Sequence, residues 1–221
     1  FSKNWVAGSS SPEIIFAYVN NSRASSPLNF TLYVNDTDGS WNYAPSDWCY
    51  SSLFADDNTL SRKGDVRLKA TFTSQDANRV IKYPNGTYQL AETSDYTCTP
   101  VVISRISEMY LVKAEALGKT NGAAALVEYM KKRYTTAPSE AAIKALSDKE
   151  YQTLILDERR REFYAEGMRW QDIKRTNRLE LLETLDGRTY LMYYPIPQDE
   201  IDMAGTVAYP QNPGYAGYTG N

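Results

Sequence analysis

Residues 147–175 read SDKEYQTLILDERRREFYAEGMRWQDIKR, and this stretch decides the fold class. Ser147 stands just before a run with helical apolar spacing, and Glu150 follows three residues later, which is the pattern of a capping box. The pattern predicts a helix that runs to Glu166 and ends at Gly167, because glycine is favoured just past the end of a helix. We therefore expect helices to dominate this part of the chain.

Further helices are predicted on the N-terminal side of this stretch. Between positions 103 and 117 the apolar residues share one helical face, and Gly118 follows as a stop. A second helix is expected over 123–134, and after the break at Pro138 a short helix ends near Leu146. Two antiparallel helices with a short connection resemble one helical repeat unit, although one unit does not make an array.

The first hundred residues have a different composition, with many Ser, Asn, Asp, Thr and Tyr residues. Alternating apolar and polar positions predict strands over 28–34 and 66–72. Residues 13–19 are apolar on both faces and indicate a buried strand. Asn85-Gly86 suits a tight hairpin turn, and residues 46–54 could form a short helix.

The end of the chain changes texture again. Residues 188–194 predict a strand, which Pro195 and Pro197 end, and a loop rich in Pro, Gly and Tyr follows. The chain is thus expected to contain a loop- and strand-rich region (1–100), a helical region (101–186) and a strand with a tail (187–221).

The composition excludes several classes of function. The chain has 221 residues, 24 basic and 27 acidic side chains and no histidine. The missing histidine removes Ser-His-Asp and Cys-His catalytic systems and histidine metal sites, and the balanced charge does not favour nucleic acid. No apolar run is long enough for a membrane span. Cys49 and Cys98 either pair or stay free and are too few for a zinc site, so we expect no metal and no cofactor.

The densest charge cluster is Asp157-Glu158-Arg159-Arg160-Arg161-Glu162. A catalytic interpretation pairs Glu158 with Glu162 or Glu166, as in a glycoside hydrolase. A structural interpretation makes Glu158 part of a buried ion-pair network, with Trp170 also mostly buried. The second is favoured, because three neighbouring arginines hold carboxylates ionised and an ionised carboxylate is a poor general acid.

The candidate ligand-binding residues are Trp41, Asn42, Tyr43, Asp47 and Trp48. Aromatic faces beside amide and carboxylate groups suit a sugar, whose C–H face stacks on a ring while its hydroxyl groups take the polar atoms. The competing interpretation is that these aromatic residues fill a core. It is favoured for Trp48, which lies in the predicted short helix, and less so for Trp41 and Tyr43, which lie in a loop.

The order of several motifs resembles the RagB/SusD family of outer-membrane nutrient-binding lipoproteins of Bacteroidetes. The motifs include Lys63-Gly64-Asp65-Val66-Arg67-Leu68 and the helical run from Ser104 to Ala116. They continue with Glu158-Arg159-Arg160-Arg161-Glu162-Phe163, Glu166-Gly167-Met168-Arg169-Trp170, Tyr194-Pro195-Ile196-Pro197 and Gln211-Asn212-Pro213-Gly214-Tyr215. The combination is more specific than any one of these pieces.

This resemblance implies a mainly α fold with extended and β segments, a helical pair, long loops and short strands. Residues 1–221 are expected to form the family's C-terminal half, without the tetratricopeptide-like first half and its lipid anchor. The implied role is non-enzymatic binding of oligosaccharides or other nutrients in polysaccharide utilisation. The implied location is the outer-membrane surface, beside a SusC-like TonB-dependent transporter. The alternatives are a helical interaction scaffold and, with less support, a carboxylate-dependent glycoside hydrolase.

Overall fold

The computed structural model of the chain describes residues 1–5, 11–18, 44–72, 80–82, 100–182, 185–204 and 210–215. The predicted strand over 28–34, the Asn85-Gly86 turn and Cys98 lie outside these residues. The chain forms two compact units, Phe1–Glu166 and Gly167–Asn221, and each is described by itself.

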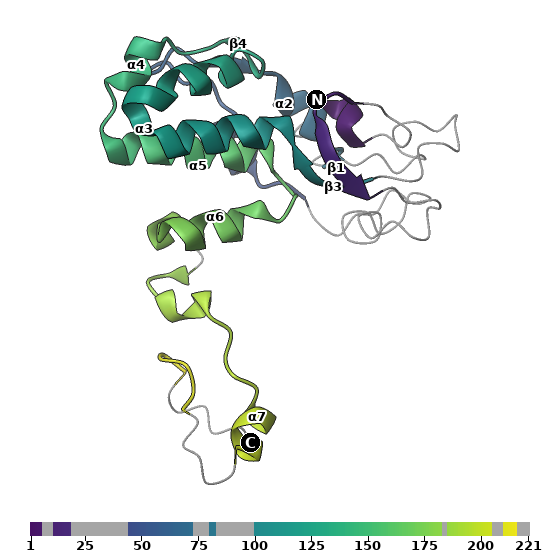
Figure 1. Cartoon of the computed structure of the whole chain (residues 1–221), viewed down its shortest axis with the longest axis vertical. Coiled ribbons are helices and arrows are strands. Elements are labelled where there is room, and N and C mark those ends of the chain that lie inside the picture. The colour runs from purple at the N-terminus through teal and green to yellow at the C-terminus, as the bar shows by residue number, and fades with distance from the viewer. Residues whose placement is uncertain are drawn as a thin grey trace. The chain divides into compact units, whose positions relative to one another are not determined.

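The first unit is built on three helices, and Figure 1 shows the longest of them, α3, beside α5. They are α3 (Ile106–Met130), α4 (Glu140–Lys144) and α5 (Asp148–Glu162), and α3 packs against both others. Gly118 interrupts α3 with a φ of 66°, a backbone conformation that favours glycine. The predicted stop at Gly118 and the predicted helices on both sides of it are therefore confirmed, but the outer bounds are wrong, because residues 103–105 lie in a strand and the second helix ends at Met130 and not at 134.

Gly122 allows the backbone at Ala114 and the side chain of Tyr151 to approach this part of α3 closely. A Cβ atom at this position would lie 2.2 Å from the carbonyl oxygen of Ala114 and 2.7 Å from the hydroxyl of Tyr151. The Tyr151 hydroxyl donates to the same Ala114 carbonyl at 2.8 Å. The absence of a side chain at Gly122 thus makes room for a hydrogen bond between α5 and α3.

Helix α5 begins with the predicted capping box. The backbone N–H of Glu150 donates to Ser147 Oγ at 3.2 Å, and the backbone N–H of Ser147 donates to Glu150 Oε2 at 2.7 Å. The helix ends at Glu162 and not at Glu166, which corrects the predicted end. The reason is that Arg105 and Lys82 donate to the Glu162 carbonyl oxygen, at 2.7 and 2.9 Å, in place of the next helical N–H.

The first unit also contains two antiparallel pairs of short strands. Strand β1 (Ile14–Tyr18) pairs with β3 (Val101–Arg105), and β2 (Lys63–Asp65) pairs with β4 (Tyr134–Thr136). The strand predicted over 13–19 is confirmed, but its predicted burial is wrong. Ile15, Phe16 and Tyr18 are exposed, and among the described residues β1 belongs to a ribbon of only two strands.

The remaining short helices of this unit are η1 (Ser2–Trp5), η3 (Cys49–Leu53) and α2 (Val66–Thr71). The η3 helix confirms the short helix predicted over 46–54, and Cys49 in it is a buried free thiol. Helix α2 corrects the strand predicted over 66–72. Asp65 caps α2 by accepting the backbone N–H of Arg67 at 2.9 Å, and this cap outweighs the alternating pattern.

Helix α3 is apolar on two faces. Leu111 and Ala114 are fully buried, as their apolar spacing predicts, whereas Ile106 and Leu117 on the same predicted face are exposed. Part of the predicted buried face is therefore wrong, and Met109 and Val112, which lie outside that face, are exposed as well. In the described part of the chain, no helix has the length and apolar character needed to cross a membrane.

The second unit contains α6 (Met168–Thr176), η5 (Leu179–Leu181), η7 (Thr189–Met192) and α7 (Gln198–Met203). Ile173, Leu185 and Met192 form its buried apolar cluster. The strand predicted over 188–194 is wrong, because a helical turn there directs Met192 into this cluster. Helix α7 was not predicted in the tail.

Side chains from the end of the chain hold the extended segment 193–196. The side-chain amide of Gln211 accepts from the backbone N–H of Ile196 at 2.7 Å and donates to its carbonyl at 2.8 Å, as a neighbouring strand would. Asn212 donates to the carbonyl of Tyr194, and Tyr215 to that of Tyr193, both at 2.8 Å. The motifs at 194–197 and 211–215 are therefore joined by hydrogen bonds and stabilise this unit.

Candidate functional site

Within the charge cluster of α5, the two carboxylates of Glu158 and Glu162 belong to a buried network in the first unit, whereas Asp157 and Arg160 are half-buried. Glu158 is fully buried and accepts hydrogen bonds from Arg67 at 2.9 Å, Arg161 at 3.0 Å and the Tyr134 hydroxyl at 2.6 Å. The predicted burial and arginine pairing of Glu158 are confirmed. Trp170 is only half-buried, so that prediction is wrong in degree.

Glu162 is equally buried and is surrounded by more cations. It pairs with Arg105, with Arg133 at 3.0 Å and with Arg67 at 3.2 Å, and the Tyr129 hydroxyl donates to it at 2.8 Å. Burial would raise the pKa of this carboxyl, but the three guanidinium groups hold the pKa well below its ordinary value.

The pKa of Glu158 is lowered in the same way, with Arg67 and Arg161 outweighing the effect of burial. Both carboxylates are therefore ionised at neutral pH and have their oxygens occupied. A general acid needs a proton to give, and a nucleophile needs an approach from solvent. The arrangement supports the structural interpretation of the cluster over a catalytic carboxylate pair.

Of the five predicted ligand-binding residues, the structure describes Asp47 and Trp48. Trp41, Asn42 and Tyr43 lie outside the described residues. Trp48 has 42% of its surface exposed, so the core interpretation is wrong for this residue. Asp47 is exposed beside it, and its carbonyl oxygen accepts from the Ser51 hydroxyl at 3.0 Å.

The short helix η3 fixes the direction of Trp48. Cys49 and Leu53 are buried on the inner side of η3, where they pack with Phe54, Phe72 and half-buried Tyr164. Cys49 Sγ donates to the Tyr164 hydroxyl at 3.4 Å. With that side anchored, the preceding residue Trp48 faces outward.

Arg160 of α5 lies against the exposed indole. Its guanidinium carbon is 4.3 Å from the centroid of the Trp48 ring, which is a cation–π geometry. A guanidinium group over one face of the ring restricts the rotation of the side chain and leaves the other face for a ligand. The structure thus brings an oriented aromatic ring, a cation and the carboxylate of Asp47 to one surface.

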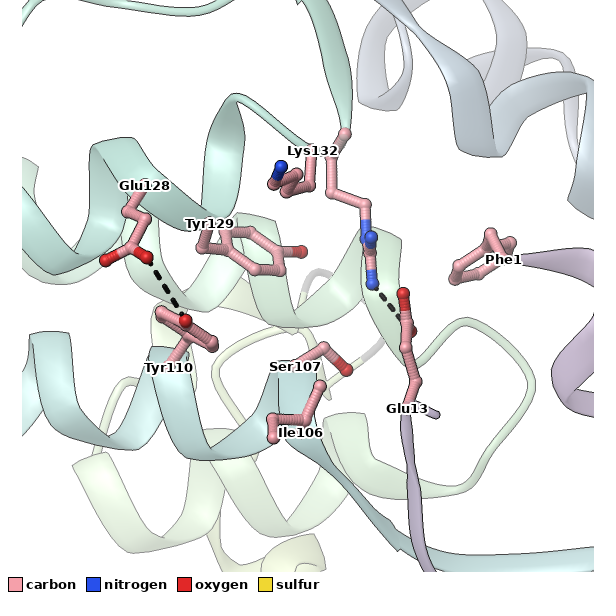
Figure 2. A pocket seen from close by; sticks show the side chains of 9 residues that line it. Phe1, Glu13, Ile106, Ser107, Tyr110, Glu128, Tyr129 and Lys132 are labelled. Atoms are coloured by element: carbon pink, nitrogen blue, oxygen red, sulfur yellow. Dashed lines mark hydrogen bonds and ion pairs between the residues drawn. The ribbon is translucent and has the colours of Figure 1, made fainter. Parts of the chain in front are cut away.

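A pocket of about 490 Å³ lies elsewhere in the first unit, and Figure 2 shows its lining side chains. The kink at Gly118 folds α3 back, so Tyr110 near its start meets Glu128 near its end, and the Tyr110 hydroxyl donates to Glu128 at 3.2 Å. On the opposite side Glu13 accepts from Arg133 at 2.8 Å.

Sequence reasoning missed this pocket. Tyr110 was assigned to an apolar helix face, and Glu13 and Glu128 stand 115 positions apart in no shared motif. Only the fold of α3 and the β1–β3 pairing bring these residues together, so no local signal in the sequence points to them. The described Asp, Glu and Cys side chains form no group suited to a metal ion.

The chain belongs to the SusD family, whose model matches residues 56–188. It is also similar to the SusD-like protein P38 of Formosa agariphila, with 30% identity over 142 residues. That match covers 58% of this chain and 27% of the relative, so the chain corresponds to a limited part of that protein. No solved structure matches the chain.

The family match encloses the buried network and, of the aromatic surface, only Arg160. Arg67, Arg105, Arg133, Glu158 and Glu162 all lie within residues 56–188, whereas Asp47 and Trp48 precede that range. The segment that matches the family model therefore contains the buried network.

Proposed function

We propose that this protein binds oligosaccharides or other nutrients at its surface without chemical conversion. The observation that carries the proposal is the oriented, exposed indole of Trp48, with Arg160 against it and Asp47 beside it. A flat ring loses little conformational entropy on binding and offers apolar area to a sugar face. Trp41, Asn42 and Tyr43 precede this segment closely and are proposed to extend the same surface.

Membership of the SusD family supports the wider role. The bound nutrient would pass to a SusC-like TonB-dependent transporter, and the protein would sit on the outer-membrane surface through a lipid anchor. The ionised, fully paired carboxylates of Glu158 and Glu162 support binding without hydrolysis.

The experiment is a titration of the full-length protein with a panel of polysaccharides, by affinity electrophoresis and then calorimetry. Trp48→Ala is expected to weaken binding by roughly 1–3 kcal/mol, from the lost area of one aromatic face. Tyr194→Ala, at an exposed tyrosine of the second unit, is the matched control and should leave affinity unchanged. Wild-type affinity in Trp48→Ala would place the binding surface elsewhere.

Two further measurements test the remaining parts. Prolonged incubation with a bound oligosaccharide should give no product by chromatography, and more than one turnover per molecule would overturn the non-enzymatic role. Purification from outer membranes in mild detergent should recover a TonB-dependent transporter with the protein, and recovery without one would contradict the delivery step.

A second candidate function is an interaction scaffold. It is favoured by the exposed apolar residues Ile106, Met109, Val112 and Leu117 of α3. A helix that is apolar on two faces is typical of one buried in a larger assembly. The same titration separates the two, because a pure scaffold binds none of the polysaccharides.

A further inference from the structure

We propose that the pocket between the two ends of α3 and Glu13 is a second binding site, which takes one neutral hexopyranose ring. Its volume of about 490 Å³ lies in the range of known ligand sites, roughly 300–1,000 Å³. None of its lining residues belongs to the Trp48 surface. The inference rests on the proposed function only in preferring a sugar over other neutral polyhydroxy compounds.

Aromatic rings supply the walls of the pocket (Figure 2). Tyr129 also lines the pocket but is buried, and its hydroxyl accepts from Arg67 at 2.6 Å and donates to Glu162. The Tyr110 ring is held by its hydrogen bond to Glu128. The Phe1 ring lies 5.0 Å from that of Trp5, which restricts it in turn. The half-buried rings of Tyr110 and Phe1 are the ones that can meet the C–H face of a pyranose.

Polar atoms with remaining hydrogen-bonding capacity surround these walls. Ser107 is buried at the pocket lining, where its Oγ accepts from Arg105 at 2.5 Å and keeps its own hydrogen for donation. Glu128 uses Oε1 for Tyr110, and Glu13 uses Oε2 for Arg133, so each carboxylate keeps a second oxygen without a partner in the described part of the chain. A carboxylate oxygen beside a ring is a good acceptor for sugar hydroxyl groups.

The charges at the pocket favour a neutral ligand. Glu13 and Arg133 form an ion pair at 2.8 Å, and the remaining Glu128 and Lys132 are one acidic and one basic group. An anion would meet two carboxylates, and a purely apolar ligand would leave those carboxylates desolvated without new hydrogen bonds. A neutral ring with many hydroxyl groups avoids both costs.

The test is a titration of the full-length protein with methyl glycosides of glucose, galactose and mannose, followed by ligand-detected NMR. Galacturonic acid and glucosamine are the charged comparisons. At least one neutral glycoside should bind, and Tyr110→Ala should weaken it about tenfold, as expected for one aromatic contact of roughly 1.4 kcal/mol. Tyr110→Phe, which keeps the ring, should weaken it less. Tyr18→Ala, at an exposed tyrosine outside the pocket, is the matched control and should have no effect.

The proposal is overturned if no neutral methyl glycoside binds, which includes the case of a pocket filled by another segment of the full-length protein. It is also overturned if a charged sugar binds more tightly, or if Tyr110→Ala leaves affinity unchanged. Those outcomes leave polysaccharide binding at Trp48 intact. Conversely, full polysaccharide affinity in Trp48→Ala would remove the proposed surface and leave this pocket untouched.

Discussion

Arg67 donates through Nη2 to Glu158 Oε2 at 2.9 Å, although 91 positions separate the two residues and both side chains have no exposed surface. Arg67 also forms ion pairs with Asp65 at 2.8 Å and with Glu162 at 3.2 Å. Because removing one partner would leave the other charge buried and uncompensated, loss of either side chain from this contact between α2 and α5 is strongly destabilising.

We predict that Glu158→Ala destabilises the protein by about 3–5 kcal/mol, since it leaves Arg67 buried beside an empty site. Urea unfolding followed by circular dichroism measures the change. Glu140→Ala is the control, because Glu140 pairs with Lys144 in an exposed i,i+4 position and should change stability by less than about 0.5 kcal/mol. An unchanged unfolding midpoint in Glu158→Ala would contradict the network's structural role.

We predict that Glu162 makes stability fall in acid. Its folded-state pKa lies well below 4.5, whereas the unfolded chain takes up the proton near 4.5. The unfolded state therefore binds more protons as the pH falls below about 4.5, and the stability that Glu162 contributes above that pH is lost. Unfolding midpoints from pH 7 to pH 3 should decline less steeply in Glu162→Gln. Equal slopes in the two proteins would refute this.

We predict that Lys82 makes the stability of the protein rise with pH in the alkaline range. Burial lowers the pKa of its ammonium to about 8, even though Glu166 opposes this and Arg105 adds to it. Between about pH 8 and the unfolded value of 10.5, the folded state releases a proton that the unfolded state keeps, so stability rises with pH. Lys82→Met should lack this rise, measured between pH 8 and pH 9.5, below the ordinary ionisation of tyrosine. A rise of the same size in Lys82→Met would assign it to another group.

We predict that Gly122→Ala lowers the stability of the protein, and the sign of the change in unfolding free energy tests the close approach within α3. Helix propensity by itself would make the substitution stabilise by about 1 kcal/mol. The contact at 2.2 Å with the Ala114 carbonyl predicts a loss of about 1–3 kcal/mol, with the Tyr151 hydrogen bond weakened. Thermal unfolding decides between them, with Val112→Ala at an exposed α3 position as the near-neutral control. A raised melting temperature in Gly122→Ala would show that the helices can separate freely.

Features that depend on neighbouring residues could be predicted from the sequence. The Ser147–Glu150 capping box and the stop at Gly118 are local, because each is fixed by the hydrogen bonds or backbone angles of a few residues. The residue at which α5 ends could not be predicted from the sequence, because it depends on Lys82 and Arg105, which approach Glu162 from distant segments.

The candidate site shows the same division. The presence of an aromatic and polar surface near Asp47 and Trp48 follows from composition, but the direction of Trp48 depends on Cys49 packing against Tyr164, 115 positions away. The buried pairing of Glu158 was predictable in kind from its charged neighbours. Its main partner Arg67 was not, since residues 66–72 alternate like a strand and only the Asp65 cap makes them a helix.

The buried network also bears on how fast the protein folds and unfolds. Its hydrogen bonds join Arg67 to Tyr129, Tyr134 and Glu162 across 62, 67 and 95 positions, so long loops must close before any of them can form. The hairpin of α3 and its packing on α5 need much shorter closures and can be in place earlier. Substitutions in the network should then mainly accelerate unfolding and leave the refolding rate nearly unchanged. The buried charges therefore determine how long the native state persists before it unfolds.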